Sequence, residues 1–214
     1  MAHFRFNERL ARIALFVPPD PEKCFLDLGI GDGLLLHLTE KIGYRTFGLD
    51  LNPAAVELAL DQFGLHAELS LSPIEEAFPN YKFEVIHMNE VIEHAAQPMK
   101  VLHWCREHLS RQGCLVVQTG NIDSAARLIR RNGWVYFRPV HVSYFSTRTL
   151  LYALEKAGFR ILHCSTNDWR IRPSITAFAS LWKQGQKRHA LNFISQFLTS
   201  LIHGVRGTVL VYAN

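Results

Sequence analysis

Cysteine is scarce in this sequence, and the few cysteines are scattered. Only four occur in 214 residues, and no two of them form a Cys-x-x-Cys pair. Such pairs are the usual ligand spacing of structural zinc sites, and small disulfide frameworks need more cysteines in a shorter chain. The sequence therefore indicates neither kind of stabilisation, and we expect reduced, buried thiols.

Long apolar runs are also missing. None approaches the roughly 20 residues of a membrane-spanning helix, and the opening MAHFRFNERLARI carries charges where a secretory signal has an apolar core. Hydrophobic residues make up 48% and charged residues 20% of the chain, which is ordinary for a globular protein. We expect one cytoplasmic domain over residues 1–214. The sequence does not indicate an oligomeric state.

Acidic residues are rare after residue 120. Residues 121–214 hold 3 Asp and Glu against 13 Lys and Arg, a net charge of +10, whereas residues 1–120 hold 16 against 10, a net charge of −6. The later part of the chain should therefore present a positive surface, which suits an anionic partner.

The most informative stretch is FLDLGIGDG, residues 25–33. An apolar strand runs into Gly29, Gly31 and Gly33, and the following LLLHLTEKI has leucines at helical spacing. Backbone N–H groups in such a strand–loop–helix unit can hold a ligand. Leu34 stands where a dinucleotide fingerprint would have its third glycine, so the spacing favours another ligand.

Two aspartates frame this loop. Asp27 lies two residues before the first glycine, where a carboxylate would repel a pyrophosphate but suits an ammonium or sulfonium group. Asp50 ends the next expected strand, where comparable folds place an acid on ribose hydroxyls. The alternative is a tight turn with two unrelated strand-end aspartates.

Strands and helices alternate along the chain, which predicts an α/β fold with a mainly parallel sheet and helices on both faces. Ligands then bind beyond the carboxyl ends of the strands. Residues 122–146 interrupt the alternation and are expected to form an insertion on the substrate side. An amphipathic stretch at 174–203 suggests either peripheral membrane contact or a docked core helix. We expect strands at 24–28, 45–50, 66–70, 83–88, 114–118 and 159–164, and helices at about 4–16, 33–42, 53–63, 98–109 and 147–157.

Three segments carry a family resemblance. FLDLGIGDG with FGLDLNPAAVELA resembles the first two motifs of the class I S-adenosylmethionine-dependent methyltransferases, and FEVIHMNEVIEHAAQPMKVLHWCREHLSRQGCLVVQTGN resembles their strand-4 to strand-5 block. HVSYFSTRTLLYALEKAGFRI resembles the segment after it. Within this family, the motifs are most similar in type to those of bacterial small-molecule methyltransferases, including the ubiquinone-biosynthesis O-methyltransferases. The resemblance implies a Rossmann-like seven-stranded sheet whose last strand, GTVLVYAN, is antiparallel between the fifth and sixth.

The resemblance also implies S-adenosylmethionine as cofactor. Asp27 would accept from its amino group, Asp50 would bind the ribose, and Leu51 would pack on the adenine. The family often has an acid after the third strand for the adenine amine, but this chain has LSLSPIEE, so Ser72 or a backbone carbonyl would serve. The implied cofactor-binding residues are Asp27, Gly29, Ile30, Gly31, Gly33, Asp50, Leu51, Ser72 and Asn89, with Asn89 beside the methionine moiety.

The segment NEVIEH offers a candidate cation site. Glu90, Glu93 and His94 share one face if the segment is helical, and two carboxylates with an imidazole can bind a divalent cation. The ubiquinone-type relatives carry this pattern and are associated with a magnesium-type ion there. Packing and hydrogen bonding at the strand end is the alternative.

The acceptor side is expected in the insertion. His141 is the candidate general base, since its reference pKa of about 6.5 suits proton removal from a hydroxyl; a histidine bonded to the loop backbone is the alternative. Tyr144, three residues later, is the second candidate catalytic residue. Arginine favours carboxylate and phosphate partners, so we expect an anionic small-molecule acceptor, with O-methylation favoured. The candidate acceptor-binding residues are Arg130, Arg131, Tyr136 and Arg138.

Two other function classes stay open. The basic later part would suit a nucleic-acid methyltransferase or binder, although the chain lacks an added binding domain and the strand-4 end reads NEVI rather than the N/D-P-P-Y type of many base-amino methyltransferases. The other class is a cofactor-binding protein without catalysis. The presence of all three loop glycines and of both aspartates, Asp27 and Asp50, argues against it.

Overall fold

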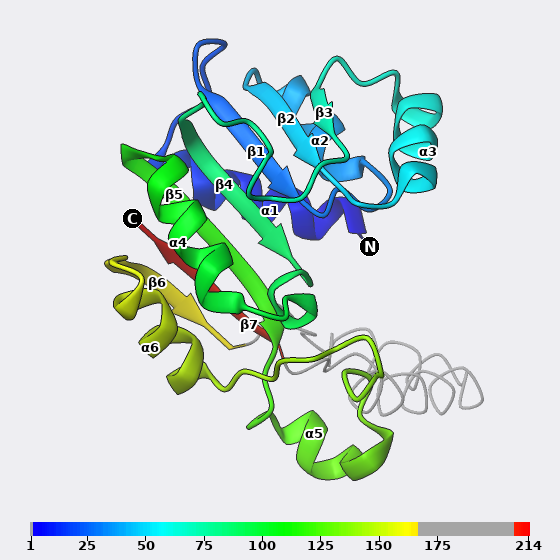
Figure 1. The fold of residues 1–214 in the computed structure, drawn as a ribbon, viewed down its shortest axis with the longest axis vertical. Coiled ribbons are helices and arrows are strands. Elements are labelled where there is room, and N and C mark those ends of the chain that lie inside the picture. Colours follow the sequence, from blue (N-terminus) through cyan, green and yellow to red (C-terminus); the bar gives the residue numbers. More distant parts are fainter. Residues whose placement is uncertain (1, 167–207) are drawn as a thin grey trace, which may run out of the picture.

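The computed structural model describes residues 2–166 and 208–214 (Figure 1). The described part is one mixed sheet flanked by helices. Its strands are β1 (Cys24–Leu28), β2 (Arg45–Leu49), β3 (Glu68–Ser70), β4 (Phe83–Asn89), β5 (Leu109–Gly120), β6 (Ile161–Ser165) and β7 (Thr208–Ala213). Its helices are α1 (Ala2–Phe16), α2 (Leu34–Lys41), α3 (Pro53–Phe63), α4 (Pro98–His108), α5 (Ala125–Arg130) and α6 (Thr147–Lys156), with short 3-10 turns η1 (Ile92–His94) and η2 (Arg131–Gly133).

The seven strands follow the order β3-β2-β1-β4-β5-β7-β6. Neighbours from β3 to β5 pair in parallel, and β7 pairs antiparallel with both β5 and β6. The Rossmann-like sheet and the antiparallel last strand between the fifth and sixth are therefore confirmed. The expected stretch at 174–203 lies outside the described residues.

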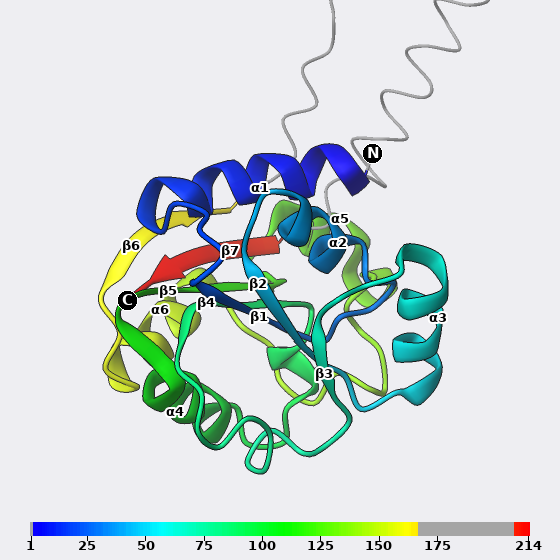
Figure 2. The ribbon, with the colours of Figure 1, turned by 90° about the horizontal axis from the view of Figure 1, so that it is seen from above.

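Alternate strand residues fill two cores on opposite faces of the sheet. Leu26 and Val117 belong to a cluster that includes residues of α4 and α6, whereas Phe25 and Val116 pack with residues of α1 and α2. Figure 2 shows α1 along one side of the sheet and α4 on the other. The apolar runs in the sequence are thus strands buried on both faces.

Local signals set most helix ends. The Asn52 side chain accepts from the Ala54 N–H at 3.1 Å and begins α3, and Gly64 ends that helix with φ +56°. Ser146 and Thr149 form a reciprocal capping box at α6. The largest boundary difference is β5, which begins at Leu109 rather than residue 114 because the chain leaves α4 already extended and pairs with Phe83. Among the described residues, no helix is both long enough and apolar enough to cross a membrane.

Candidate functional site

The glycine loop after β1 depends on left-handed backbone geometry. Gly29, Gly31 and Gly33 have φ of +75°, +56° and +76°, a region that side chains with a Cβ rarely adopt. A Cβ on Gly33 would also lie 2.5 Å from the Cβ of Ala59, whereas one on Gly31 would meet nothing within 4 Å. The loop therefore packs at its end and is open in its middle, where Gly31 is exposed.

Asp50 links the glycine loop after β1 to the segment that follows β2. Its Oδ2 accepts from the Gly31 N–H at 3.3 Å, and its Oδ1 accepts from the Asn52 N–H at 2.9 Å. The carboxylate is only half-buried. Leu51 follows it with 68% of its surface exposed, whereas Ile30 of the loop is buried. The loop, Asp50 and Leu51 thus form one accessible rim at the carboxyl ends of β1 and β2.

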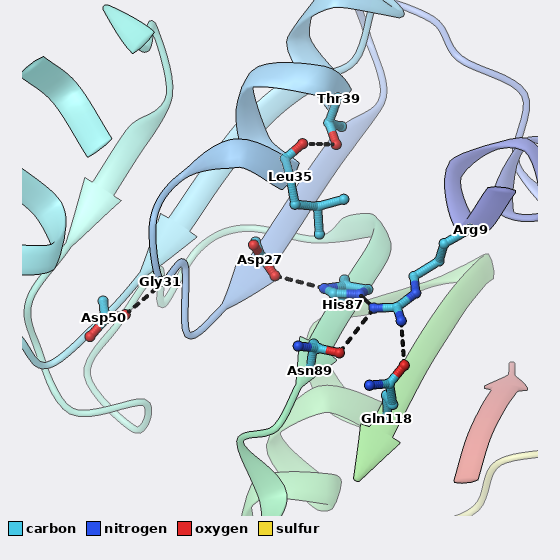
Figure 3. Close-up of polar contacts among 9 residues, drawn as sticks. All are labelled: Arg9, Asp27, Gly31, Leu35, Thr39, Asp50, His87, Asn89 and Gln118. Atoms are coloured by element: carbon cyan, nitrogen blue, oxygen red, sulfur yellow. Dashed lines mark hydrogen bonds and ion pairs between the residues drawn. The ribbon is translucent and has the colours of Figure 1, made fainter. Parts of the chain in front are cut away.

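Asp27 is buried beside this rim, in a polar network (Figure 3). Its Oδ1 is 2.7 Å from His87 Nδ1; the two residues are register partners in β1 and β4. Arg9 of α1 donates to His87 Nε2 at 2.9 Å and to Asn89 Oδ1 at 3.1 Å, and its other amino group donates to Gln118 Oε1. Burial raises the pKa of Asp27, against the His87 contact and the Arg9 charge.

Sequence reasoning missed Arg9, His87 and Gln118 as parts of this region. The one available signal was His87, a titratable residue inside the apolar run that forms β4. Of the two remaining predicted cofactor contacts, Asn89 is engaged by Arg9, and Ser72 is half-buried beyond the end of β3, with its N–H donating to Ser70 Oγ at 3.2 Å.

The turn after β4 holds two carboxylates in different surroundings. Glu90 has φ +60°, a strained value for a residue with a side chain; its Oε1 accepts from Gln118 Nε2 at 3.1 Å. Glu93 is buried, and its Oε2 accepts from Thr119 Oγ1 at 2.9 Å, while Oε1 has no hydrogen-bond partner among the described residues. Burial, reinforced by the charge of Glu90, raises the pKa of Glu93 to about 7.

Two histidines meet beside Glu93. His94 and His141 have ring centroids 4.6 Å apart and nearly perpendicular planes. Their Nδ1 atoms lie 3.0 Å from the Val140 carbonyl and 2.7 Å from the Tyr136 carbonyl. Because a carbonyl only accepts, Nδ1 carries the proton in both rings and the neutral imidazole keeps its lone pair on Nε2.

The possible metal ligands differ from the predicted set. Ligand atoms of Glu93, His94 and His141 lie within 4.8 Å of one another. Glu90 is not in this group, since the 3-10 geometry of η1 does not place residues as an α-helical turn would and Gln118 engages the Glu90 side chain. His141, from the insertion, takes its place.

A cavity of about 270 Å³ lies between the turn after β4 and residues 135–141 of the insertion. It gathers five predicted residues: Glu90 and His94 from the turn after β4, and Tyr136, Arg138 and His141 from the insertion. Its full lining is Glu90, His94, Val135, Tyr136, Arg138, Val140 and His141.

Three of the residues predicted for the acceptor side do not line this cavity. Arg131 is exposed in η2, and Arg130 ends α5. Tyr144 is 40% exposed and packs its ring against Phe137, with centroids 5.5 Å apart. Among the described residues, the cavity therefore offers the guanidinium of Arg138 rather than the arginine cluster that the sequence suggests.

The raised pKa of Glu93 should appear in the pH dependence of stability. The folded protein holds this proton up to about pH 7, whereas the unfolded chain releases it near its ordinary value of about 4.3. Protonated Glu93 therefore favours the folded state at low pH, and this contribution is lost progressively as pH rises from about 4.3 to about 7. About 2.5 kcal/mol of the loss falls between pH 5 and 8. Glu93→Gln should reduce the fall in unfolding free energy between pH 5 and 8 by that amount, measured by urea denaturation in EDTA.

The matched control is Glu57→Gln, on the exposed side of α3. It should keep the wild-type dependence on pH. An unchanged slope in Glu93→Gln would contradict the assignment of this titration to Glu93.

Comparisons with known proteins identify the family and the fold. A family model described as a methyltransferase domain matches residues 1–164. The ubiquinone biosynthesis O-methyltransferase of Bradyrhizobium diazoefficiens is 32% identical over 99 residues, which are 45% of this chain and 39% of that protein. The chain thus matches about two fifths of the length of the first curated relatives.

Solved structures share the fold. A SAM-dependent methyltransferase from Archaeoglobus fulgidus superimposes with a TM-score of 0.62 at 17% identity, over 97% of this chain and 93% of that one. The N-methyltransferase NodS from Bradyrhizobium japonicum, solved with S-adenosyl-L-homocysteine, gives a TM-score of 0.64 at 15% identity, over 99% and 85% of the two chains.

Proposed function

The chain belongs to the methyltransferase domain family, and we propose that it transfers a methyl group from S-adenosylmethionine to a small acceptor. The observation that carries the proposal is the contact between Gly31 and Asp50 at 3.3 Å. It joins the glycine loop to the carboxylate that we assign to the ribose, at the edge of the sheet where ligands of such folds bind.

The cofactor would lie along this rim. The open middle of the loop suits close approach of the methionine part, Asp50 suits the ribose hydroxyls, and Leu51 suits the adenine. Asp27 would accept a hydrogen bond from the cofactor ammonium group, directly or through water. The relative NodS was solved with S-adenosyl-L-homocysteine, which supports the same cofactor here.

The acceptor would occupy the cavity between the strand-4 turn and the insertion. Arg138 supplies a positive charge for an anionic group, and Val135 and Val140 supply apolar contact. His141 presents Nε2 with a free lone pair, which suits removal of a hydroxyl proton during attack on the sulfonium methyl. Holding the two reactants in line provides the rest of the rate enhancement. The name of the curated relatives favours an oxygen nucleophile.

A magnesium ion fits this site poorly. Magnesium prefers oxygen ligands in octahedral geometry, whereas the local donor set is two imidazoles and one carboxylate. No step of the proposed mechanism therefore uses magnesium, and we expect turnover to be the same with magnesium or with EDTA.

The proposal is tested with the purified chain. Calorimetry should show micromolar binding of S-adenosylmethionine and S-adenosylhomocysteine, and a screen of anionic hydroxylated aromatics should yield a methylated product by mass spectrometry. Absence of binding by both cofactors would refute the proposal. Binding without any turnover across acceptor classes would favour a non-catalytic cofactor-binding protein.

A further inference from the structure

The buried network beside the cofactor rim spans four elements of the fold. Asp27 comes from β1, His87 and Asn89 from β4, Gln118 from β5 and Arg9 from α1 (Figure 3). Asp27, His87, Gln118 and Arg9 are all less than 9% exposed. Buried polar groups are costly unless they are satisfied, so a set this large in the sheet centre calls for a functional explanation.

His87 is the link between the two charges. Its Nδ1 lies 2.7 Å from the Asp27 carboxylate, which accepts, and its Nε2 lies 2.9 Å from the Arg9 guanidinium, which only donates. Only one state of the ring satisfies both neighbours, namely the neutral imidazole with the proton on Nδ1. Burial lowers the pKa of His87, which favours the same neutral form.

The ring is therefore fixed in position and in tautomer. The Nδ1–H bond takes up one oxygen of Asp27 and sets the orientation of the carboxylate. His87 in turn is held by Arg9, whose other contacts to Asn89 and Gln118 tie α1 to the ends of β4 and β5. This is the arrangement by which a second residue orients a functional carboxylate.

We propose that His87 is a positioning residue of the cofactor site, which acts through its Nδ1–H on Asp27. This inference rests on the proposed function, since Asp27 is assigned there to the cofactor ammonium. His87 does not touch the cofactor. The chemistry it serves is recognition of a cationic amine by a carboxylate held in a single orientation.

Two substitutions test the two ring nitrogens of His87 separately. His87→Asn places an amide N–H where Nδ1 lies and keeps a donor for Asp27, whereas His87→Gln reaches the Nε2 position and serves Arg9 alone. Calorimetry with S-adenosylhomocysteine should give a Kd for His87→Asn within about threefold of wild type. The Kd for His87→Gln should be weaker by tenfold or more. Equal Kd values in wild type and both variants, or equal losses in both, would overturn the proposal.

A stability control separates positioning from general damage. Thr39→Ala removes a buried hydrogen bond to the Leu35 carbonyl in α2 and touches no member of the network among the described contacts. It should lower Tm without changing the Kd for S-adenosylhomocysteine. A Kd that followed Tm across all three variants would mean that His87 has only a structural role.

A measurement on the wild type keeps the proposal testable if His87→Gln does not fold. Long-range 1H–15N correlation of the histidine side chains should show for His87 a protonated Nδ1 and an unprotonated Nε2, in signals absent from His87→Asn. An imidazolium or an Nε2–H tautomer would overturn the proposal. Failure of the wild type to bind the cofactor would instead refute the proposed function, and this inference with it.

Discussion

Asp50→Ala is expected to weaken binding of S-adenosylhomocysteine by about 100-fold. The carboxylate accepts the Gly31 and Asn52 N–H groups, so it is held at the loop before any ligand arrives. Hydrogen bonds between a charged group and its partner contribute about 1.5–3 kcal/mol, and loss of a charged partner for two ribose hydroxyls lies at the upper end of that range. The measurement is isothermal calorimetry of both proteins under the same buffer conditions.

Two controls make this expectation specific. Asp50→Asn keeps the shape and the contact to Gly31 but removes the charge, and should lose less affinity than Asp50→Ala. Asp61→Ala, an exposed substitution on α3, should bind as wild type does. If Asp50→Ala bound within threefold of wild type, the ribose would have to lie elsewhere and the glycine loop would be only a turn.

The sequence was sufficient for features that depend on neighbouring residues. Glycine spacing predicted a loop whose three glycines all have positive φ. The expected helix at 53–63 matches α3, which Asn52 caps and Pro53 begins, because these signals act within a few residues. The strand runs were recognised because both faces of a mostly parallel sheet are covered. The position of the last strand came from family resemblance, since no local signal specifies which strands it joins.

The sequence was insufficient where distant segments meet. Arg9 and Gln118 are 109 positions apart, and nothing near either of them indicates the contact. The strand-4 turn shows the same limit: a helical assumption grouped Glu90 with Glu93 and His94, whereas the folded chain brings in His141 from the insertion. Net charge likewise does not specify which side chain faces a cavity: of the three arginines predicted in the insertion, Arg138 lines the cavity described above.

Substitution of His141 is the most direct test of catalysis, because the hydrogen bond from its side chain to the Tyr136 carbonyl can be preserved while the basic nitrogen is removed. His141→Asn can keep a side-chain N–H donor for that carbonyl but has no basic nitrogen at the Nε2 position. Because a general base contributes about 10²–10⁴-fold, kcat for methylation of a hydroxyl acceptor should fall at least 100-fold. The Kd for S-adenosylhomocysteine should stay unchanged, since His141 lines the acceptor cavity rather than the rim.

Controls for this variant distinguish proton removal from loop damage. His66→Asn, at an exposed position before β3, should retain wild-type kcat. Added imidazole should partly restore turnover in His141→Asn, because a free base can then enter the cavity of about 270 Å³ that the histidine lines. A kcat within threefold of wild type would show that the acceptor loses its proton elsewhere. In that case His141 only supports the loop, and the strained Glu90 at the cavity wall would become the next residue to test, through Glu90→Gln.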